Sequence, residues 1–240
     1  MTTSLLADAN FDRLRRNPYP GRGLVIGRAP AGDAWLILYW IMGRSANSRN
    51  RRFAVQGGTV RTEPVDLKLV KDPSLIIYEA MLELPGLYIV SNGDQTRTVA
   101  EALKSNGTFD GALSTREREP DAPNFTPRIT GLLDLRAGPG ALALSLLKAH
   151  PLDPQLTDRT TVRPALPAPG FGFGLTTYTG DGNPLPSFSG DPLLLPLQGV
   201  AEVVLEAYWD ALNAENRISL AVKAIPAGGG ASRTLVRNRY

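Results

Sequence analysis

A continuous run of apolar and aromatic residues, Ala34 to Met42, constrains the fold of this chain more than any other feature. The run reads A-W-L-I-L-Y-W-I-M, and we predict that it forms a buried strand. The segment that follows, Gly43 to Arg52, reads G-R-S-A-N-S-R-N-R-R and holds four arginines but no acidic or large apolar side chain. An arginine fork at the end of a core strand can bind a phosphate or a carboxylate through two hydrogen bonds. We therefore expect an anion site here, and the alternatives are a solvated basic turn or an RNA-binding arm.

The composition of the chain excludes several kinds of chemistry. The 240 residues include no cysteine, so thiol catalysis, disulfide bonds and thiolate metal sites are excluded. The single histidine, His150, precedes a proline in an expected loop. Histidine acid–base chemistry and multi-histidine metal sites are therefore not expected. Catalysis would depend on Arg, Lys, Tyr, Asp, Glu, Ser, Thr and backbone groups.

Length and patterning predict one globular domain over residues 1–240. Apolar residues make up 42% of the chain and charged residues 20%, and the net charge of +3 is too mild to argue for nucleic acid. The N-terminus lacks the basic start and apolar run of a signal peptide, and no window approaches ~18 apolar residues. We expect a cytoplasmic protein that binds neither nucleic acid nor membrane.

Short apolar segments between turn signals predict a strand-rich domain. We expect strands at 23–28, 34–42, 53–56, 59–62, 75–78, 87–90, 126–135, 141–147, 170–179 and 218–225. We expect helices at 8–16, 96–105 and 199–213, the last with an apolar face of Val200, Val203, Val204, Ala207, Tyr208, Ala211 and Leu212. Irregular segments are predicted at 111–124, 151–169 and 180–196, with a polar lead-in at 1–16 and a basic tail at 228–240. The sum is an α+β layered domain.

The polar residues Ser91 to Asp94 lie between a predicted strand and a predicted helix. Such a junction presents backbone N–H groups and suits the binding of an anionic ligand. Asp94 is expected to cap the helix that follows it. The alternative is an ordinary capped helix start that binds no ligand.

Five sequence islands occur in one order along the first part of the chain. They are N-P-Y-P-G-R-G at 17–23, G-R-S-x-N-S-R-N-R at 43–51, P-S-L-I-I-Y at 73–78, S-N-G-D-Q-T at 91–96 and R-E-x-E-P-D-A-P-N-F-T-P-R-I-T-G at 116–131. Together they resemble the archaeal-type IMP cyclohydrolase family, and T-Y-x-G-D-G-x-P-x-P-S-F at 177–188 extends the match more thinly. The resemblance implies a four-layer αββα sandwich like that of N-terminal-nucleophile hydrolases, without use of a terminal nucleophile.

The resemblance implies an enzyme for the last step of purine synthesis. In that step the carboxamide nitrogen of 5-formamidoimidazole-4-carboxamide ribonucleotide attacks the formyl carbon, and the oxygen leaves as water to give IMP. The reaction involves no redox change and needs no metal or organic cofactor. It requires a site for a dianionic phosphate, a donor to the formyl oxygen and a group that takes the amide proton. A purine ribonucleotide is the implied partner, and a homo-oligomer is expected.

The resemblance also implies three catalytic residues, Arg44, Tyr78 and Glu119. Arg44 would lie near the formyl or carboxamide oxygen and stabilise or orient it. Tyr78 would donate a hydrogen bond to the formyl oxygen, and its alternative role is that of a core tyrosine with a satisfied hydroxyl. Glu119 would handle the proton, with Glu117 as the alternative carboxylate.

A second group of residues is expected to contact the substrate. It consists of Asn47, Arg49, Arg51, Asn92, Gly93, Asp94, Thr126 and Arg128. Either Arg49 or Arg51 would bind the phosphate, and Arg128 would contact substrate or brace Glu119. Tyr19 and Arg22 in the first island are expected to be structural.

Three other functions compete with this interpretation. The first is a nucleotide-binding protein of the same fold, with another purine-ribonucleotide substrate or a non-enzymatic role. The second is an amide hydrolase with Thr2 as its terminal nucleophile, which is disfavoured because Thr2 lies some twenty residues before the first strand. The third is an RNA binder that would use Trp35, Tyr39 and Trp40, although these residues suit a core better than a stacking platform.

Overall fold

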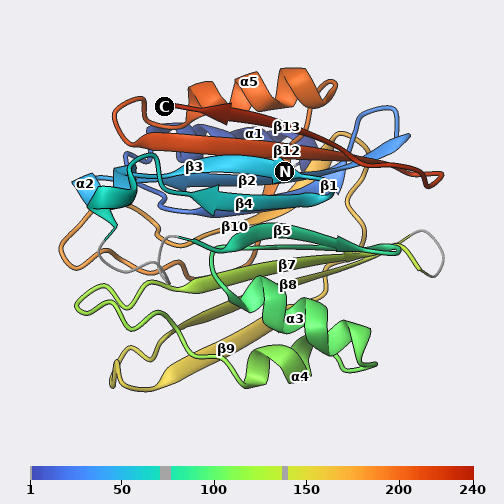
Figure 1. The fold of residues 1–240 in the computed structure, drawn as a ribbon. Coiled ribbons are helices and arrows are strands. Elements are labelled where there is room, and N and C mark those ends of the chain that lie inside the picture. The colour runs from blue at the N-terminus through green and yellow to red at the C-terminus, as the bar shows by residue number, and fades with distance from the viewer. Residues whose placement is uncertain (1, 71–76, 137–139) are drawn as a thin grey trace.

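The computed structural model describes residues 2–70, 77–136 and 140–240, which form two antiparallel sheets and a few helices (Figure 1). One sheet contains β1 (Gly23–Arg28), β2 (Ala34–Met42), β10 (Phe171–Thr176), β11 (Leu193–Pro196), β12 (Arg217–Pro226) and β13 (Arg233–Asn238), in the spatial order β11-β10-β1-β2-β12-β13. The other contains β3 (Arg52–Gln56), β4 (Thr59–Glu63), β5 (Glu79–Leu84), β6 (Leu87–Ser91), β7 (Arg128–Asp134), β8 (Ala141–Ala149) and β9 (Thr157–Val162), in sequence order. The predicted α+β class is confirmed.

Strand β2 lies inside the six-stranded sheet, between β1 and β12, and both of its faces are covered. Ile37 and Tyr39 face the layer between the two sheets, whereas Leu38 and Trp40 face the helices on the other side. Successive side chains of a strand point to opposite faces, so one strand contributes to two cores. The double burial accounts for the unbroken apolar run and confirms the predicted buried strand.

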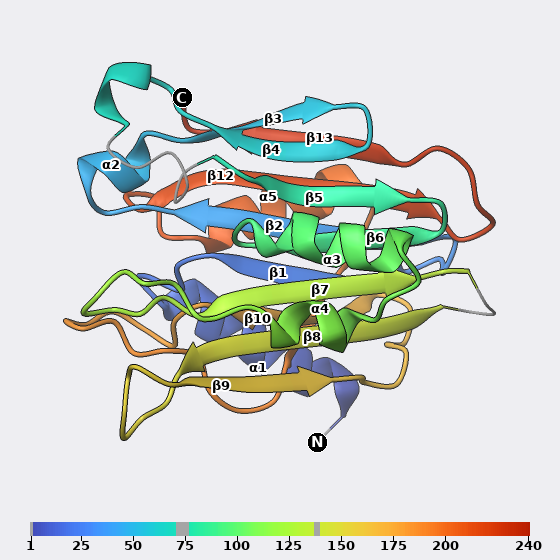
Figure 2. The same cartoon turned by 60° about the horizontal axis from the view of Figure 1, so that its bottom comes forward.

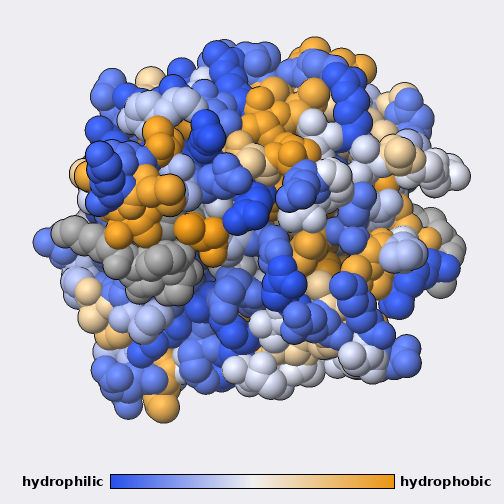
Figure 3. All heavy atoms as spheres, in the orientation of Figure 1, coloured by the Kyte–Doolittle hydropathy of each residue, from blue (hydrophilic) through white to orange (hydrophobic). Residues whose placement is uncertain are grey.

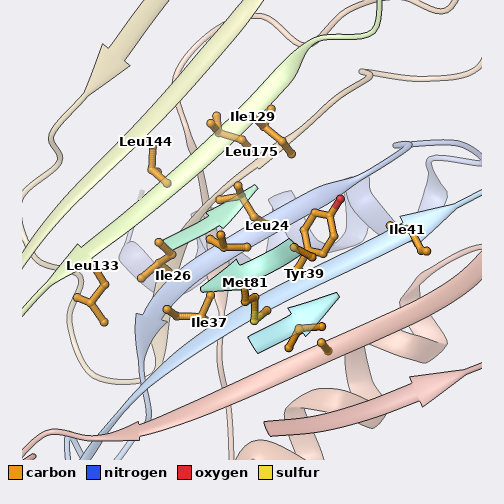
Figure 4. Packing of buried hydrophobic residues seen from close by; sticks show 14 of the residues in the cluster. Leu24, Ile26, Ile37, Tyr39, Ile41, Met81, Ile129, Leu133, Leu144 and Leu175 are labelled. Carbon is orange, nitrogen blue, oxygen red and sulfur yellow. The ribbon is translucent and has the colours of Figure 1, made fainter. Parts of the chain in front are cut away.

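The layer between the sheets is a continuous apolar core (Figure 4). Leu24 and Ile26 of β1 pack against β7, where Ile129 and Leu133 face them. At Gly131 of β7, a Cβ atom would lie 2.8 Å from Cδ1 of Ile26. The close approach of the two sheets therefore requires glycine at this position.

Helices cover the outer face of each sheet (Figures 1 and 2). Helices α1 (Thr3–Arg16) and α5 (Ala201–Ala211) pack on the six-stranded sheet, and α3 (Gln95–Lys104) and α4 (Phe109–Ser114) pack on the seven-stranded sheet. The remaining helical turns, α2 (Ala46–Arg49) and η1 (Leu67–Leu69), lie in connections. None of the helices that the structure describes is long and apolar enough to cross a lipid bilayer.

Four segments that were predicted to be irregular contain regular structure. Helix α4 overlaps the start of 111–124, and β9, β11 and β13 lie within 151–169, 180–196 and 228–240. The last three are edge strands. Strand β9 reads T-D-R-T-T-V and has no apolar run; its ladder with β8 holds it in place. An edge strand with much solvent contact carries little of the hydrophobic signal on which strand prediction depends.

Three predicted boundaries also change. The strand predicted at 75–78 lies partly outside the described residues, and the strand that the structure describes here, β5, starts at Glu79. The helix predicted at 8–16 begins at Thr3. On α5, the predicted apolar face is confirmed at Val204, Tyr208, Ala211 and Leu212, which are buried. It was wrong at Val200 and Val203, which are 65% and 53% exposed, and it missed the buried Leu205 and Trp209.

A buried ion pair joins the two sheets at the end of β12. Lys223 on β12 is almost fully buried, and its Nζ lies 2.8 Å from Oε2 of Glu83 on β5. Lys223 also donates to the carbonyl of Gly58, and Ser232 donates to the same Glu83 oxygen at 2.6 Å. Burial opposes ionisation of Glu83, but the hydrogen bonds from Lys223 and Ser232 outweigh it and lower the pKa of Glu83. The pair therefore depends on both charges being present.

We predict that Glu83→Gln lowers the free energy of unfolding by about 3 kcal/mol at pH 7, because it leaves the buried Lys223 ammonium without a counter-charge. Since folding lowers the pKa of Glu83, its contribution is complete above about pH 4.5 and is lost as the pH falls through the lowered value. Urea unfolding at several pH values measures both effects. The matched control is Glu202→Gln, which removes the carboxylate of an exposed ion pair with Arg233 and is expected to cost much less. Equal losses in the two variants would contradict the prediction.

Candidate functional site

The candidate site lies at one end of the two sheets, where strand ends from both converge. The ends of β2 and β10 lie beside the start of β1, and the end of β6 lies beside the start of β7. A pocket of about 340 Å³ opens here. One wall comes from the segments around β1 and α2, with Tyr19, Arg22, Arg44, Ser45, Asn47, Ser48 and Arg51, and the other holds Asp121, Asn124, Thr126, Tyr178 and Leu185.

Two arginines in the pocket, the half-buried Arg22 and the buried Arg51, have no carboxylate bound to them among the described residues. Arg22 directly precedes β1, and Arg51 directly precedes β3 and is 2% exposed. Arg51 donates from Nε to the carbonyl of Ser48 at 3.0 Å and from Nη2 to that of Met42 at 3.4 Å. Among the residues described, neither guanidinium forms an ion pair, and the buried Nε of Arg22 has no hydrogen-bond partner. An unpaired buried cation is costly, so this wall of the pocket is suited to an anion.

The two guanidinium groups affect each other. Burial lowers the pKa of Arg51, and the nearby charge of Arg22 lowers it further. The buried Oδ1 of Asn47 in the same wall also lacks a partner among the described residues. These unsatisfied groups make the wall suited to polar atoms of a ligand or of water.

Beneath the arginines lies a pair of tyrosines. The hydroxyls of Tyr39 and Tyr78 are 2.8 Å apart, and both side chains are buried. Burial raises the pKa of Tyr39, with a further contribution from Tyr78. Tyr78 therefore lies near Arg22 with its hydroxyl already bonded inside the protein. Tyr78 is not among the residues that line the pocket, so its position matches the second predicted role, that of a core tyrosine with a satisfied hydroxyl.

Arg44 lies at the mouth of the pocket rather than in its depth. Its side chain is 40% exposed and forms an ion pair with Asp181 in the segment after β10. The guanidinium carbon lies 4.5 Å from the centre of the Tyr19 ring. Stacking on an aromatic ring and pairing with a carboxylate fix the plane and direction of a guanidinium.

Glu119 lies behind the pocket, in a buried ion pair with Arg128. Its Oε1 is 3.1 Å from Nη1 of Arg128, which also lies 2.8 Å from Oδ1 of Asp94. Burial raises the pKa of Glu119, and the charges of Arg128 and Arg22 oppose that effect. Glu117, the alternative carboxylate, is 59% exposed and pairs with Arg159 on the surface. Of the two carboxylates, Glu119 is therefore the buried one.

The junction between β6 and α3 is a braced turn. Asn92 accepts hydrogen bonds from the backbone N–H of Ile129 and from Gln95, and donates to the carbonyl of Pro127. A Cβ atom at Gly93 would lie 2.6 Å from Nη1 of Arg128, so glycine allows that guanidinium to approach. Asp94 occupies the predicted N-cap position, but its side chain makes no capping hydrogen bond. Its carboxylate binds Arg116 and Arg128 instead.

Arg49 is separated from the other predicted residues. It donates from Nε to the carbonyl of Gly43 and lines a second, more apolar hollow. Val65 and Leu69 around η1 form part of that hollow, and apolar side chains gather over this region in the space-filling view (Figure 3). Of the two arginines considered for the phosphate, Arg51 is the one in the main pocket.

Eight of the residues that line the pocket were not among the predicted site residues. They are Tyr19, Arg22, Ser45, Ser48, Asp121, Asn124, Tyr178 and Leu185. Each lies within a sequence island that carried the resemblance. Membership of an island could therefore have marked these residues as site candidates. Arg22 was expected to be structural because a sequence does not reveal that a charge is buried and unpaired.

Two competing functions lose support from the geometry. Thr2 caps α1, with its hydroxyl oxygen accepting from the N–H of Leu5, and it does not line the pocket. Trp35, Tyr39 and Trp40 are at most 3% exposed, so they offer no stacking platform for RNA. Among the described residues, no three histidine or acidic side chains are grouped as a metal site would require.

We predict that inorganic phosphate stabilises the protein by binding between Arg22 and Arg51. At tenfold the dissociation constant, one bound anion adds about 1.4 kcal/mol, which raises Tm by about 3 °C for a chain of this size. Arg22→Met should abolish the shift. Differential scanning fluorimetry with phosphate at constant ionic strength measures it. Arg52→Met removes a neighbouring exposed arginine and should retain the shift; the prediction fails if Arg22→Met retains it too.

The comparison with known protein families gives one match. The family model described as IMP cyclohydrolase-like protein matches residues 19–229 of the chain. A search of curated proteins found no match to this chain. The matched range contains every residue that lines the pocket.

Proposed function

We propose that this chain, which belongs to the IMP cyclohydrolase-like protein family, closes the ring of 5-formamidoimidazole-4-carboxamide ribonucleotide to give IMP and water. The family implies a purine ribonucleotide as substrate. The observation that carries the proposal is the pair formed by the half-buried Arg22 and the buried Arg51, which have no bound carboxylates among the described residues. A phosphate dianion matches their combined charge, and a pocket of about 340 Å³ falls in the range of small-ligand sites.

In the proposed mechanism, the arginine pair binds the phosphate, and Asn47 contributes a further polar contact. Thr126 lines the opposite wall and would help to position the ring. Asn92 and Gly93 act indirectly, because they fix Arg128 behind the pocket. Holding the carboxamide nitrogen against the formyl carbon in one molecule is the largest contribution that binding can make to such a ring closure.

Negative charge develops on the formyl oxygen as the nitrogen attacks the formyl carbon. We propose that the guanidinium of Arg44 stabilises this charge. The contacts with Tyr19 and Asp181 support this role, because they orient the guanidinium before substrate arrives. Tyr78 is proposed as a second donor, with Tyr39 satisfying its other hydrogen bond. Glu119 is proposed to carry a proton to the departing oxygen, since burial favours its protonated form.

We also propose that the fold is the four-layer αββα sandwich of the N-terminal-nucleophile hydrolases. The helices on the outer face of each sheet support this assignment. The terminal residues play no part in the proposed chemistry. A nucleotide-binding protein with another purine ribonucleotide, or with no turnover, remains the second candidate, because the arginine pair would serve its phosphate equally well.

The direct test is absorbance-monitored turnover of the formamido nucleotide by purified protein. Wild-type protein is expected to form IMP, and Arg44→Ala is expected to lower kcat by about 100-fold, as for the loss of one oxyanion donor. Glu119→Gln should lower kcat by at least as much. The control is Arg61→Ala, which removes an exposed arginine of β4 and should leave kcat unchanged. Tight IMP binding without turnover by the wild type would favour the second candidate, and absence of both would exclude the proposed function.

A further inference from the structure

Three side chains of the pocket form one hydrogen-bonded chain. The hydroxyl of Tyr178 lies 2.6 Å from Oγ1 of Thr126, and that oxygen is bonded in turn to Oδ2 of Asp121. The backbone N–H of Thr126 donates to Oδ1 of the same carboxylate at 2.7 Å. All three residues line the pocket. The chain therefore borders the pocket, and its Tyr178 end lies near Arg22.

The chemistry of these groups fixes the direction of the hydrogen bonds. An ionised carboxylate only accepts, so Thr126 donates its single hydroxyl proton to Asp121. The oxygen of Thr126 then accepts from Tyr178, whose own oxygen keeps its lone pairs free. Burial raises the pKa of Tyr178, which keeps the phenol neutral before reaction. A proton that arrives at the Tyr178 oxygen can thus be passed on towards Asp121.

We infer that Tyr178, Thr126 and Asp121 form a proton relay that takes the amide proton during ring closure. The inference rests on the proposed function. Tyr178 contacts the carboxamide nitrogen and is the catalytic member. Thr126 and Asp121 act through it as positioning residues. Asp121 is thus the proton store on this wall, while Glu119 is bound to Arg128 behind it.

The protons balance over the two stages of the reaction. When the carboxamide nitrogen bonds to the formyl carbon, the nitrogen transfers one proton to the hydroxyl oxygen of Tyr178. The hydroxyl proton of Tyr178 moves to Thr126, and the hydroxyl proton of Thr126 moves to Asp121. The relay then runs in reverse and returns this proton to the formyl oxygen, forming a hydroxyl. Glu119 protonates that hydroxyl, the carbon–oxygen bond breaks with loss of water, and Glu119 regains a proton from the former formamido nitrogen. No other reagent is needed.

The test compares variants that break the relay with variants that preserve it. Tyr178→Phe and Thr126→Val are expected to lower kcat by about 100-fold or more, the usual value of general acid–base catalysis. IMP affinity, measured by calorimetry, should change less than about threefold, since each loses only a neutral hydroxyl. Thr126→Ser restores the hydroxyl and should turn over at least tenfold faster than Thr126→Val. Asp121→Asn should also lower kcat, because it removes the final proton acceptor of the relay.

Tyr208→Phe is the matched control. Tyr208 is a buried tyrosine whose hydroxyl donates to the carbonyl of Pro196 on the outer face of the six-stranded sheet. Its loss should leave kcat unchanged. If wild-type protein forms IMP and Tyr178→Phe is equally fast, the relay is overturned and the proposed function stands. Parallel loss of IMP binding and kcat in Tyr178→Phe and Thr126→Val assigns them a structural role and also overturns it. If the wild type forms no IMP, the proposed function fails, and the relay fails with it.

Discussion

The architecture depends on the requirement that both faces of β2 be buried. A strand with large apolar side chains on each face is stable only if a layer packs on either side of it. The seven-stranded sheet covers one face, and α1 and α5 cover the other. The second sheet exposes an outer face of its own, which α3 and α4 cover. Each layer is therefore present because the one inside it has an apolar face to bury.

At one end of the layers the apolar side chains give way to charged and phenolic ones. Arg22, Arg51, Tyr39 and Tyr78 lie where the strands of both sheets start or stop. The opposite end is closed by the ion pair of Lys223 and Glu83. At the end that holds Lys223, the buried charge is neutralised within the protein. At the pocket end, the two arginines form no ion pairs with the residues that the structure describes. That difference, more than pocket size, distinguishes a binding end from a structural end.

Much of the interior could be predicted from sequence, because burial leaves a pattern. Strands β1, β2 and β12 and the β3–β4 hairpin lie within a residue or two of the predictions, since apolar runs and glycine turns mark them. The edge strand β9 could not be predicted, because its polar residues owe their conformation to pairing with β8. At the site, the arginine-rich segment pointed to an anion. Which arginine is buried depends on α2, which turns Arg49 away and leaves Arg51 in the pocket, and Arg22 joins it only through the tertiary fold.

The pocket draws its residues from both sheets. Arg22 and Tyr178 flank strands of the six-stranded sheet, whereas Thr126 leads into β7 of the seven-stranded one. Closely packed interiors transmit small shifts, so a volume change at Ile26 or Gly131 alters how one sheet sits on the other. Residues of the interlayer core thus set the width of the pocket. Evolution of a new substrate preference in such a fold can therefore proceed by repacking the core while every pocket residue stays the same.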